Sequence, residues 1–324
     1  MTRLGALVAV AWLQAAPSGA LPCLVWTRAP ADTSAALKEA GVTRVCVAPE
    51  LVTAWQAAGF EAVPLAETDL TSRRKLSTPG IDHRVDLVSA TRSPWIAANG
   101  WRVLRNPQRP YRYAVRPDAA ALAAAEAFVY GADAAVSIDP PDVAGFGRMS
   151  SFLRELAPAR QYEPLADFGV VDDGTEAMGE VLNLLVRRNL LFELVDAPVS
   201  RYRVNVVVGP SGFSRNDIAE PSEFALRIRR ELTDAARTIR IYGSEVVICR
   251  VTGDGSGVRV HLLNYGGRQI QGLRVRIRGA YRRGDAQVAD LGTEALEPLT
   301  VAEGATEFSI PRLSTYAVVD LRKE

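Results

Sequence analysis

Between Val246 and Leu263 the chain reads VVICRVTGDGSGVRVHLL, and this stretch decides the class of fold. Two strand-like runs, 246–252 and 258–263, flank a glycine-rich linker at 253–257, which is a β-hairpin signal. Helix and strand patterns alternate before residue 239, whereas only strand-like runs follow it. We therefore expect an α/β body of parallel βα units followed by a C-terminal antiparallel β-sandwich over residues 238–324.

The strand after this hairpin alternates apolar and charged side chains, so one face should be buried and the other exposed. We interpret the charged face as solvated, with binding of an anion or a polysaccharide as the alternative. His261 alternates with Val260 and Leu262, which predicts that its ring faces solvent. The alternating residues are Leu273, Val275 and Ile277 against Arg274, Arg276 and Arg278.

The α/β body begins with repeated strand–helix–strand units in a first segment, residues 21–165. Units of this length favour parallel pairing with right-handed crossovers. A polar stretch near residue 75 interrupts the series, and a helix that begins near Pro117 ends at Gly131. Strands are expected at 24–26, 43–47, 60–65, 85–89, 101–104 and 134–138, with helices at 33–40 and 51–58.

A second segment, residues 166–237, is expected to form a small flavodoxin-like α/β unit. Its strands should lie at 168–171, 191–195 and 203–208, with helices at 175–188 and 221–233. The run Asp173-Gly174-Thr175-Glu176 fits a capping box in which Asp173 caps the first helix. Two arrangements stay open: a partial TIM-like barrel plus this unit, or one compact barrel made from both segments.

The composition excludes several functions. Lys and Arg number 38 against 37 Asp and Glu, so no overall charge favours nucleic acid or an anionic membrane. Only two histidines occur, His83 and His261, and the sequence has neither a glycine-rich phosphate loop nor a Gly-x-Ser-x-Gly elbow. We therefore expect no metal and no cofactor. A binding partner should be neutral or carry its charge at a local position only. Whether the chain forms a homo-oligomer is left open.

The first twenty residues have the pattern of a signal peptide. Arg3 precedes an apolar run at 4–13, and small residues lead to Ala20. The run is about half of the ~20 residues that a membrane-spanning helix needs. We expect cleavage after Ala20 and a secreted or periplasmic protein without a transmembrane segment.

Two of the three cysteines, Cys23 and Cys46, lie in the first two expected strands. An exported protein could join them in a disulfide, because neighbouring strands bring such positions together. Reduced cysteines buried in strands are nevertheless the commoner case, and they are our expectation here.

Three carboxylates are candidates for catalysis: Glu126, Asp139 and Asp172. Glu126 lies on the same helical face as Leu122 and Val129, so its carboxylate should be paired or have a raised pKa. Asp139 and Asp172 each follow an expected strand, and open α/β sheets bind ligands at the carboxyl ends of their strands. The structural alternatives are a buried pair for Glu126 and a helix cap for Asp139.

Aromatic and polar residues gather between positions 92 and 113. Flat aromatic faces beside amide and guanidinium donors suit sugar rings, which present apolar patches ringed by hydroxyls. Ordinary core packing is the alternative. The candidates for carbohydrate binding are Arg92, Trp95, Asn99, Trp101, Tyr111 and Tyr113.

Three stretches resemble secreted bacterial glycoside hydrolases of the β-galactosidase kind, in which a barrel is followed by an amidotransferase-like α/β domain and a small β-sandwich. They are AAALAAAEAFVYGADA at 119–134, residues 168–209, and FSIP at 308–311 with YAVVDL at 316–321. The resemblance implies a carbohydrate-active protein that acts on or binds a neutral glycan. It also implies two catalytic carboxylates on separate strand ends.

The chain departs from this pattern in three places. The acid/base glutamate of these hydrolases follows an asparagine, whereas Asn99 precedes Gly100. The first segment, about 140 residues, is shorter than the ~200 that eight βα units need. The second segment has no cysteine, which excludes amidotransferase activity. The other hypotheses are therefore a non-catalytic glycan-binding protein and a structural protein of the cell envelope.

Overall fold

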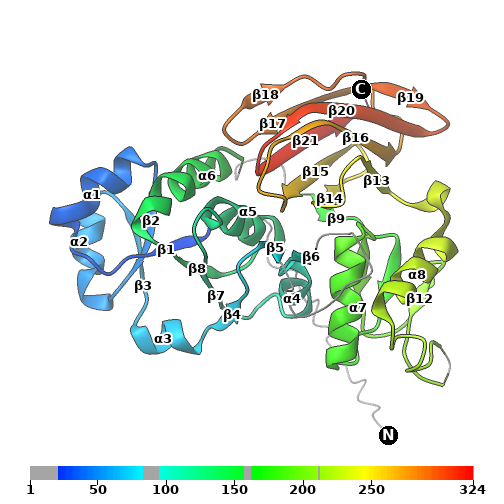
Figure 1. The fold of residues 1–324 in the computed structure, drawn as a ribbon, viewed down its shortest axis with the longest axis horizontal. Coiled ribbons are helices and arrows are strands. Elements are labelled where there is room, and N and C mark those ends of the chain that lie inside the picture. The colour runs from blue at the N-terminus through cyan, green and yellow to red at the C-terminus, as the bar shows by residue number, and fades with distance from the viewer. Residues whose placement is uncertain (1–20, 83–94, 157–161, 211, 324) are drawn as a thin grey trace, which may run out of the picture.

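The computed structural model describes residues 21–82, 95–156, 162–210 and 212–323. Figure 1 shows a larger α/β part in blue to green, a smaller α/β part around helices α7 and α8, and a β-sandwich in orange and red above both. The expected fold class, a parallel βα body with a C-terminal antiparallel sandwich, is confirmed. The predicted leader 1–20, His83, the strand 85–89 and Arg92 lie outside the described residues.

The first sheet is parallel and open. Its six strands follow the order β3-β2-β1-β8-β7-β4, and all neighbours are parallel. Strands β3 and β4 are the two edges of this sheet, which is separate from the sheet of the second segment. The strands are β1 Cys23–Val25, β2 Arg44–Val47, β3 Glu61–Pro64, β4 Arg74–Leu76, β7 Tyr111–Ala114 and β8 Ala134–Ser137.

The helices of this part bury their apolar faces against the sheet. The alanine-rich α5 (Ala120–Tyr130) is buried along almost its whole length and ends at Gly131, whose positive φ of 67° is the left-handed cap for which glycine is favoured. The other helical elements are α1 Pro30–Glu39, η1 Pro49–Leu51, α2 Val52–Ala57, α3 Glu67–Ser72, α4 Gly100–Arg105, η2 Pro140–Asp142 and α6 Val143–Leu156.

Two local expectations are wrong. Residues 101–104 form helix α4 rather than a strand, because a short apolar run fits either element and α4 gains its stability by packing Trp101 against Gly179. The polar stretch near residue 75 contains the edge strand β4, and residues 111–114 form β7. A short hairpin of β5 (Gly80–Asp82) and β6 (Trp95–Ala97) lies beside them.

The second α/β part has a separate parallel sheet in the order β11-β10-β12. Its first helix is capped by Thr175, whose hydroxyl accepts a hydrogen bond from Met178 N, so the expected cap at Asp173 is wrong by two residues. The Asp173 side chain instead accepts from Thr175 N and Oγ1. The elements are β10 Phe168–Val170, α7 Glu176–Arg187, β11 Phe192–Leu194, β12 Asn205–Val206 and α8 Pro221–Ala236.

The sandwich packs a four-stranded sheet, β13-β16-β20-β19, onto a six-stranded sheet, β18-β17-β21-β15-β14-β9. The expected hairpin is present as β14 and β15, and Leu273, Val275 and Ile277 are buried between the sheets. The strands are β9 Glu163–Pro164, β13 Ile239–Tyr242, β14 Val247–Gly253, β15 Gly257–Asn264, β16 Ile270–Arg278, β17 Arg283–Val288, β18 Gly292–Glu294, β19 Thr300–Ala302, β20 Ala305–Leu313 and β21 Tyr316–Arg322.

The arginine row of β16 is largely engaged by acidic side chains. Arg274 and Arg276 both contact Glu307, and Arg278 donates a hydrogen bond to the carbonyl oxygen of Ala236. Arg274 and Arg278 are exposed and Arg276 is partly exposed, which agrees with the interpretation of the row as a solvated face.

The six-stranded sheet is covered on both faces, because the α/β body lies against its second face. The prediction that His261 faces solvent is therefore wrong: it is 5% exposed, its Nδ1 lies 2.7 Å from Tyr316 Oη, and Tyr316 in turn contacts Phe152 of α6. Burial, together with the charges of Arg259 and Arg250, lowers the pKa of His261 to about 3. The ring is thus neutral in the folded protein.

The neutral His261 predicts a loss of stability in acid. Its folded pKa of about 3 lies below the ordinary value of 6.5, so the unfolded chain binds the extra proton between these two pH values. The contribution of the neutral His261 to the free energy of unfolding is complete above pH 6.5. It falls progressively toward pH 3, by a few kcal/mol in total. Urea unfolding from pH 3 to 7 should show a weaker pH dependence for His261→Gln than for the natural protein; equal slopes would contradict this account.

Cys23 and Cys46 form a disulfide between the adjacent strands β1 and β2, with their Cα atoms 5.5 Å apart. The expectation of reduced cysteines is therefore wrong, because parallel pairing of Val25 with Cys46 brings the two side chains to one face of the sheet. Cys249 is free and buried in the sandwich, and burial raises the pKa of its thiol to about 12.

Within the part of the chain that the structure describes, every helix is too short or too polar to cross a membrane.

Candidate functional site

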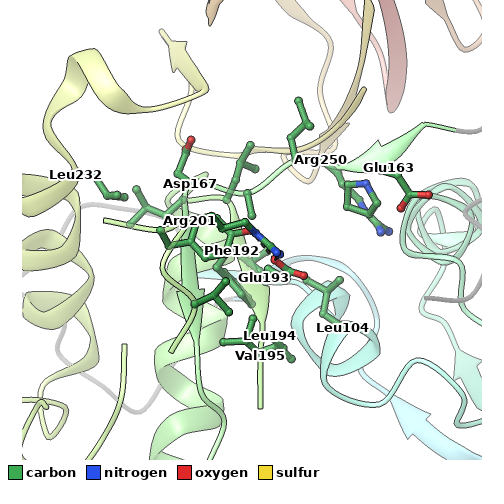
Figure 2. A pocket seen from close by; sticks show the side chains of 18 of the residues that line it. Leu104, Glu163, Asp167, Phe192, Glu193, Leu194, Val195, Arg201, Leu232 and Arg250 are labelled. Atoms are coloured by element: carbon green, nitrogen blue, oxygen red, sulfur yellow. Dashed lines mark hydrogen bonds and ion pairs between the residues drawn. The ribbon is translucent and has the colours of Figure 1, made fainter. Parts of the chain in front are cut away.

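A groove runs between the three parts of the molecule. It has a volume of about 2040 Å³, and its walls come from the end of α4, the end of α5, strand β14 with β9, and strand β11. Figure 2 shows Phe192 to Val195 to the left of Leu104, with Arg250 and Glu163 above them. Aromatic side chains in its lining are Tyr130, Tyr162, Phe192 and Tyr202.

Strand β11 gives the groove one long wall because it is the edge strand of its sheet. It pairs only with β10 among the described strands, and the continuous run 189–197 lines the groove. Val171 and Asp172, which follow β10, line it as well. The groove therefore includes the carboxyl ends of two parallel strands, where open α/β sheets place their ligands.

An ion pair joins the two α/β parts in this groove. Asp172 accepts hydrogen bonds from Arg105 Nε at 2.5 Å and from Arg105 Nη2 at 2.6 Å, and Arg105 Nη2 also donates to Thr175 O at 2.8 Å. Both side chains are largely buried, and the hydrogen bonds to Asp172 raise the pKa of Arg105. The bidentate geometry fixes the orientation of Asp172.

Two further charge pairs line the groove. Glu193 of β11 contacts Arg201 and accepts a hydrogen bond from the Tyr202 hydroxyl at 2.5 Å (Figure 2). Asp167 is 3% exposed and accepts from Thr238 N and Oγ1, with Arg278 Nη2 at 3.9 Å. Burial raises the pKa of Asp167, and the Thr238 hydrogen bonds oppose that rise.

Asn189 connects the second sheet to the sandwich. It ends α7 with a positive φ of 54°, and its side chain donates to Val247 O at 2.9 Å and accepts from Cys249 N at 2.7 Å. One amide therefore satisfies two backbone groups on the edge of β14. This contact holds the wall of the groove formed by β11 against the wall formed by β14.

Glu126 lies behind the groove wall, fully buried on α5. Its Oε1 accepts from Asn99 N at 2.7 Å and from the Tyr265 hydroxyl at 2.6 Å; its Oε2 accepts from Asn99 Nδ2 at 2.9 Å and from the Tyr113 hydroxyl at 2.8 Å. Burial raises the pKa of Glu126, and the four donors oppose that rise. The carboxylate is thus tied to three segments, one of which belongs to the sandwich.

The three candidate carboxylates lie in different surroundings. Glu126 is enclosed by its donors, Asp172 lines the groove and is bound to Arg105, and Asp139 is exposed after β8, at the carboxyl end of the first sheet. Asp139 begins η2 without a side-chain capping hydrogen bond, so the expected cap is wrong. The sequence placed Asp139 and Asp172 correctly at strand ends, but those strands belong to two separate sheets.

The candidate sugar-binding residues that the structure describes lie mainly in the core. Asn99, Trp101, Tyr111 and Tyr113 expose little or no surface, so a sugar ring could reach none of them in this conformation. Trp95 is partly buried beneath the guanidinium of Arg187, 4.2 Å from its ring centre. The groove aromatics were missed by sequence reasoning because they come from four separate elements and loops and form no local pattern.

No group of three or more potential metal ligands from His, Cys, Asp and Glu occurs in the described ranges. In the groove, aromatic rings stand beside the Asn189 amide and oriented ion pairs. Such surfaces suit ligands with both apolar patches and hydroxyl groups.

In its architecture the chain has a glycoside-hydrolase-like fold. A solved structure with this fold is α-L-fucosidase isoenzyme 2 from Paenibacillus thiaminolyticus, with a TM-score of 0.51, 10% identity, and coverage of 85% of this chain and 70% of that one. No protein-family model and no curated protein matches the sequence.

Two other solved structures show weaker similarity. A rhamnosidase from Novosphingobium sp. PP1Y has a TM-score of 0.41 and 11% identity over 66% of this chain and 31% of that one. The GH42 β-galactosidase Gan42B from G. stearothermophilus has a TM-score of 0.40 and 7% identity over 76% and 53%. The chain thus spans about a third of the rhamnosidase and about half of the β-galactosidase.

Proposed function

We propose that this protein binds an oligosaccharide in the groove and does not hydrolyse it. The observation that carries the proposal is the lining of the groove, where the partly exposed rings of Tyr162, Phe192 and Tyr202 lie among paired charges. Aromatic faces stack on the apolar faces of sugars, and fixed polar groups bind their hydroxyls. Because most charges in the groove are paired, most of the bound sugars should be neutral.

The state of the three candidate carboxylates favours binding over hydrolysis. Glycoside hydrolysis normally needs two carboxyl groups about 5 to 10 Å apart on either side of the scissile bond. Both oxygens of Glu126 are occupied by four donors, and Asp172 is held by Arg105. Asp139 belongs to the other sheet and is absent from the groove lining.

We also propose that the protein acts outside the cytoplasm. The signal-like pattern at 1–20 and the Cys23–Cys46 disulfide support this location, because structural disulfides persist mainly in oxidising compartments. Cell fractionation of the producing organism, with antibody detection of the chain, tests this location directly.

Binding can be tested with the purified mature protein by calorimetry against a panel of oligosaccharides, with product analysis of the same mixtures. We expect binding without cleavage. Tyr202→Ala should weaken binding about tenfold, since one aromatic contact contributes on the order of 1 kcal/mol or more. Tyr242→Ala is the matched control, because Tyr242 is 37% exposed on the outer sheet of the sandwich.

Two outcomes would overturn the proposal. Failure of the whole panel to bind would remove the glycan-binding function. Release of product would show hydrolysis instead, and Glu126→Gln, Asp139→Asn and Asp172→Asn would then be assayed one at a time to find the catalytic groups.

A further inference from the structure

Arg250 differs from the ion-paired arginines of the groove. Arg105, Arg201 and Arg278 each lie beside a carboxylate, those of Asp172, Glu193 and Asp167. Among the described residues, the contacts of the Arg250 guanidinium are the carbonyl oxygen of Val129, at 2.6 Å from Nη1, and the ring of Tyr130, at 5.5 Å. Neither contact supplies a full negative charge.

The surroundings of Arg250 make this lack of a carboxylate costly. The side chain is partly buried on β14, and burial lowers its pKa, while Tyr130 is the group that opposes this effect. Val129 lies in the last turn of α5. The negative end of the helix dipole there can neutralise about half of the positive charge of Arg250 at most. A desolvated cation is stabilised strongly when an anion approaches it.

Arg250 and Tyr130 both line the groove and can act together on a ligand. One of the five N–H donors of the guanidinium is used by Val129 O, so the planar fork keeps donors for a carboxylate or sulfate. Burial and the nearby Glu126 raise the pKa of Tyr130 far above neutral pH. Its phenol therefore stays protonated and can donate a hydrogen bond to an anion.

We propose that Arg250 and Tyr130 form an anion subsite, and that the glycan bound in the groove carries an acidic sugar at this position. The inference rests on the proposed glycan-binding function and deepens it. The acidic group is either the carboxylate of a uronic acid or a sulfate ester, and both present coplanar or clustered oxygens to the guanidinium. The ion pairs of Asp172, Glu193 and Asp167 leave the positions beside them to neutral sugars.

The first experiment uses the natural sequence alone. Calorimetry compares an oligosaccharide that carries one uronic acid, the same oligosaccharide with that carboxyl group reduced to an alcohol, and a monosulfated oligosaccharide beside its desulfated form. We expect at least one acidic ligand to bind on the order of tenfold more tightly than its neutral counterpart, with an advantage that shrinks as salt is raised. The pair with the larger ratio identifies carboxylate or sulfate.

Equal affinities within both pairs would overturn the anion subsite but leave the glycan-binding function standing. Failure of all four ligands and of the neutral panel would overturn both. The natural protein therefore gives a decisive result even if variants of Arg250 fold poorly.

Variants then locate the effect. Arg250→Gln should abolish the preference for the acidic ligand over its neutral counterpart, while Arg250→Lys should keep part of this preference because the charge remains without the planar fork. Arg203→Gln removes the same charge from an exposed arginine of the same groove and is the matched control. An equal loss in both glutamine variants would show a general field effect and contradict a built subsite.

Discussion

Replacement of Glu126 by glutamine is expected to lower the free energy of unfolding by about 3 to 5 kcal/mol, although the side chain keeps its size and shape. Four donors converge on the two carboxylate oxygens, and a glutamine offers them one oxygen and one NH₂ group. At least one buried donor then faces another donor. Urea unfolding at pH 7 measures the loss.

Two comparisons separate this network from a general effect of the substitution. Glu155→Gln changes an exposed glutamate on α6 and should alter stability by less than about 0.5 kcal/mol. Tyr265→Phe removes a single donor and should cost about 1 to 2 kcal/mol. If Glu126→Gln unfolded at the same urea concentration as the natural protein, the network would not be a source of stability.

Loss of the disulfide is the second large expected effect. The double variant Cys23→Ser with Cys46→Ser should be about 3 kcal/mol less stable, because the bridge closes a loop of 23 residues in the unfolded chain. Calorimetric melting of the variant and of the natural protein with and without reductant checks this expectation.

Cys249→Ala is the control for the disulfide, since Cys249 is buried but free. Reductant should lower the melting temperature of the natural protein and of Cys249→Ala by the same amount, and it should leave the double variant unchanged. A natural protein that melts identically in oxidising and reducing buffer would contradict a stabilising bridge.

The sequence predicted the fold class well where the pattern was long and repeated. The hairpin at 246–263 and the amphipathic helix at 175–188 both appear within a few residues of their expected bounds. Short elements were less predictable: β4 has only three residues, of which Leu76 alone is buried, and the apolar run of α4 fits a helix and a strand equally.

The candidate site was less predictable than the fold, because the groove lies between the two α/β parts and the sandwich rather than within one of them. The groove depends on how α4, β11 and β14 meet, and no local periodicity encodes that meeting. His261 shows the same limit: its alternation with apolar neighbours was recognised correctly, but the second face of its sheet is covered by α6. The buried pairing of Glu126 was foreseen as an alternative, since a carboxylate on an apolar helical face needs partners.

The position of β9 has a consequence for synthesis of the chain on the ribosome. These two residues precede the second α/β part, yet they complete the edge of a sheet whose other strands begin at residue 247. Glu126 likewise lacks one of its hydrogen-bond donors until Tyr265, 139 residues later in the chain, has been synthesised. The nascent α/β body must therefore remain incompletely closed until the C-terminal strands emerge, and a chain that ends near residue 237 should attract chaperones and proteases rather than persist as a smaller working protein.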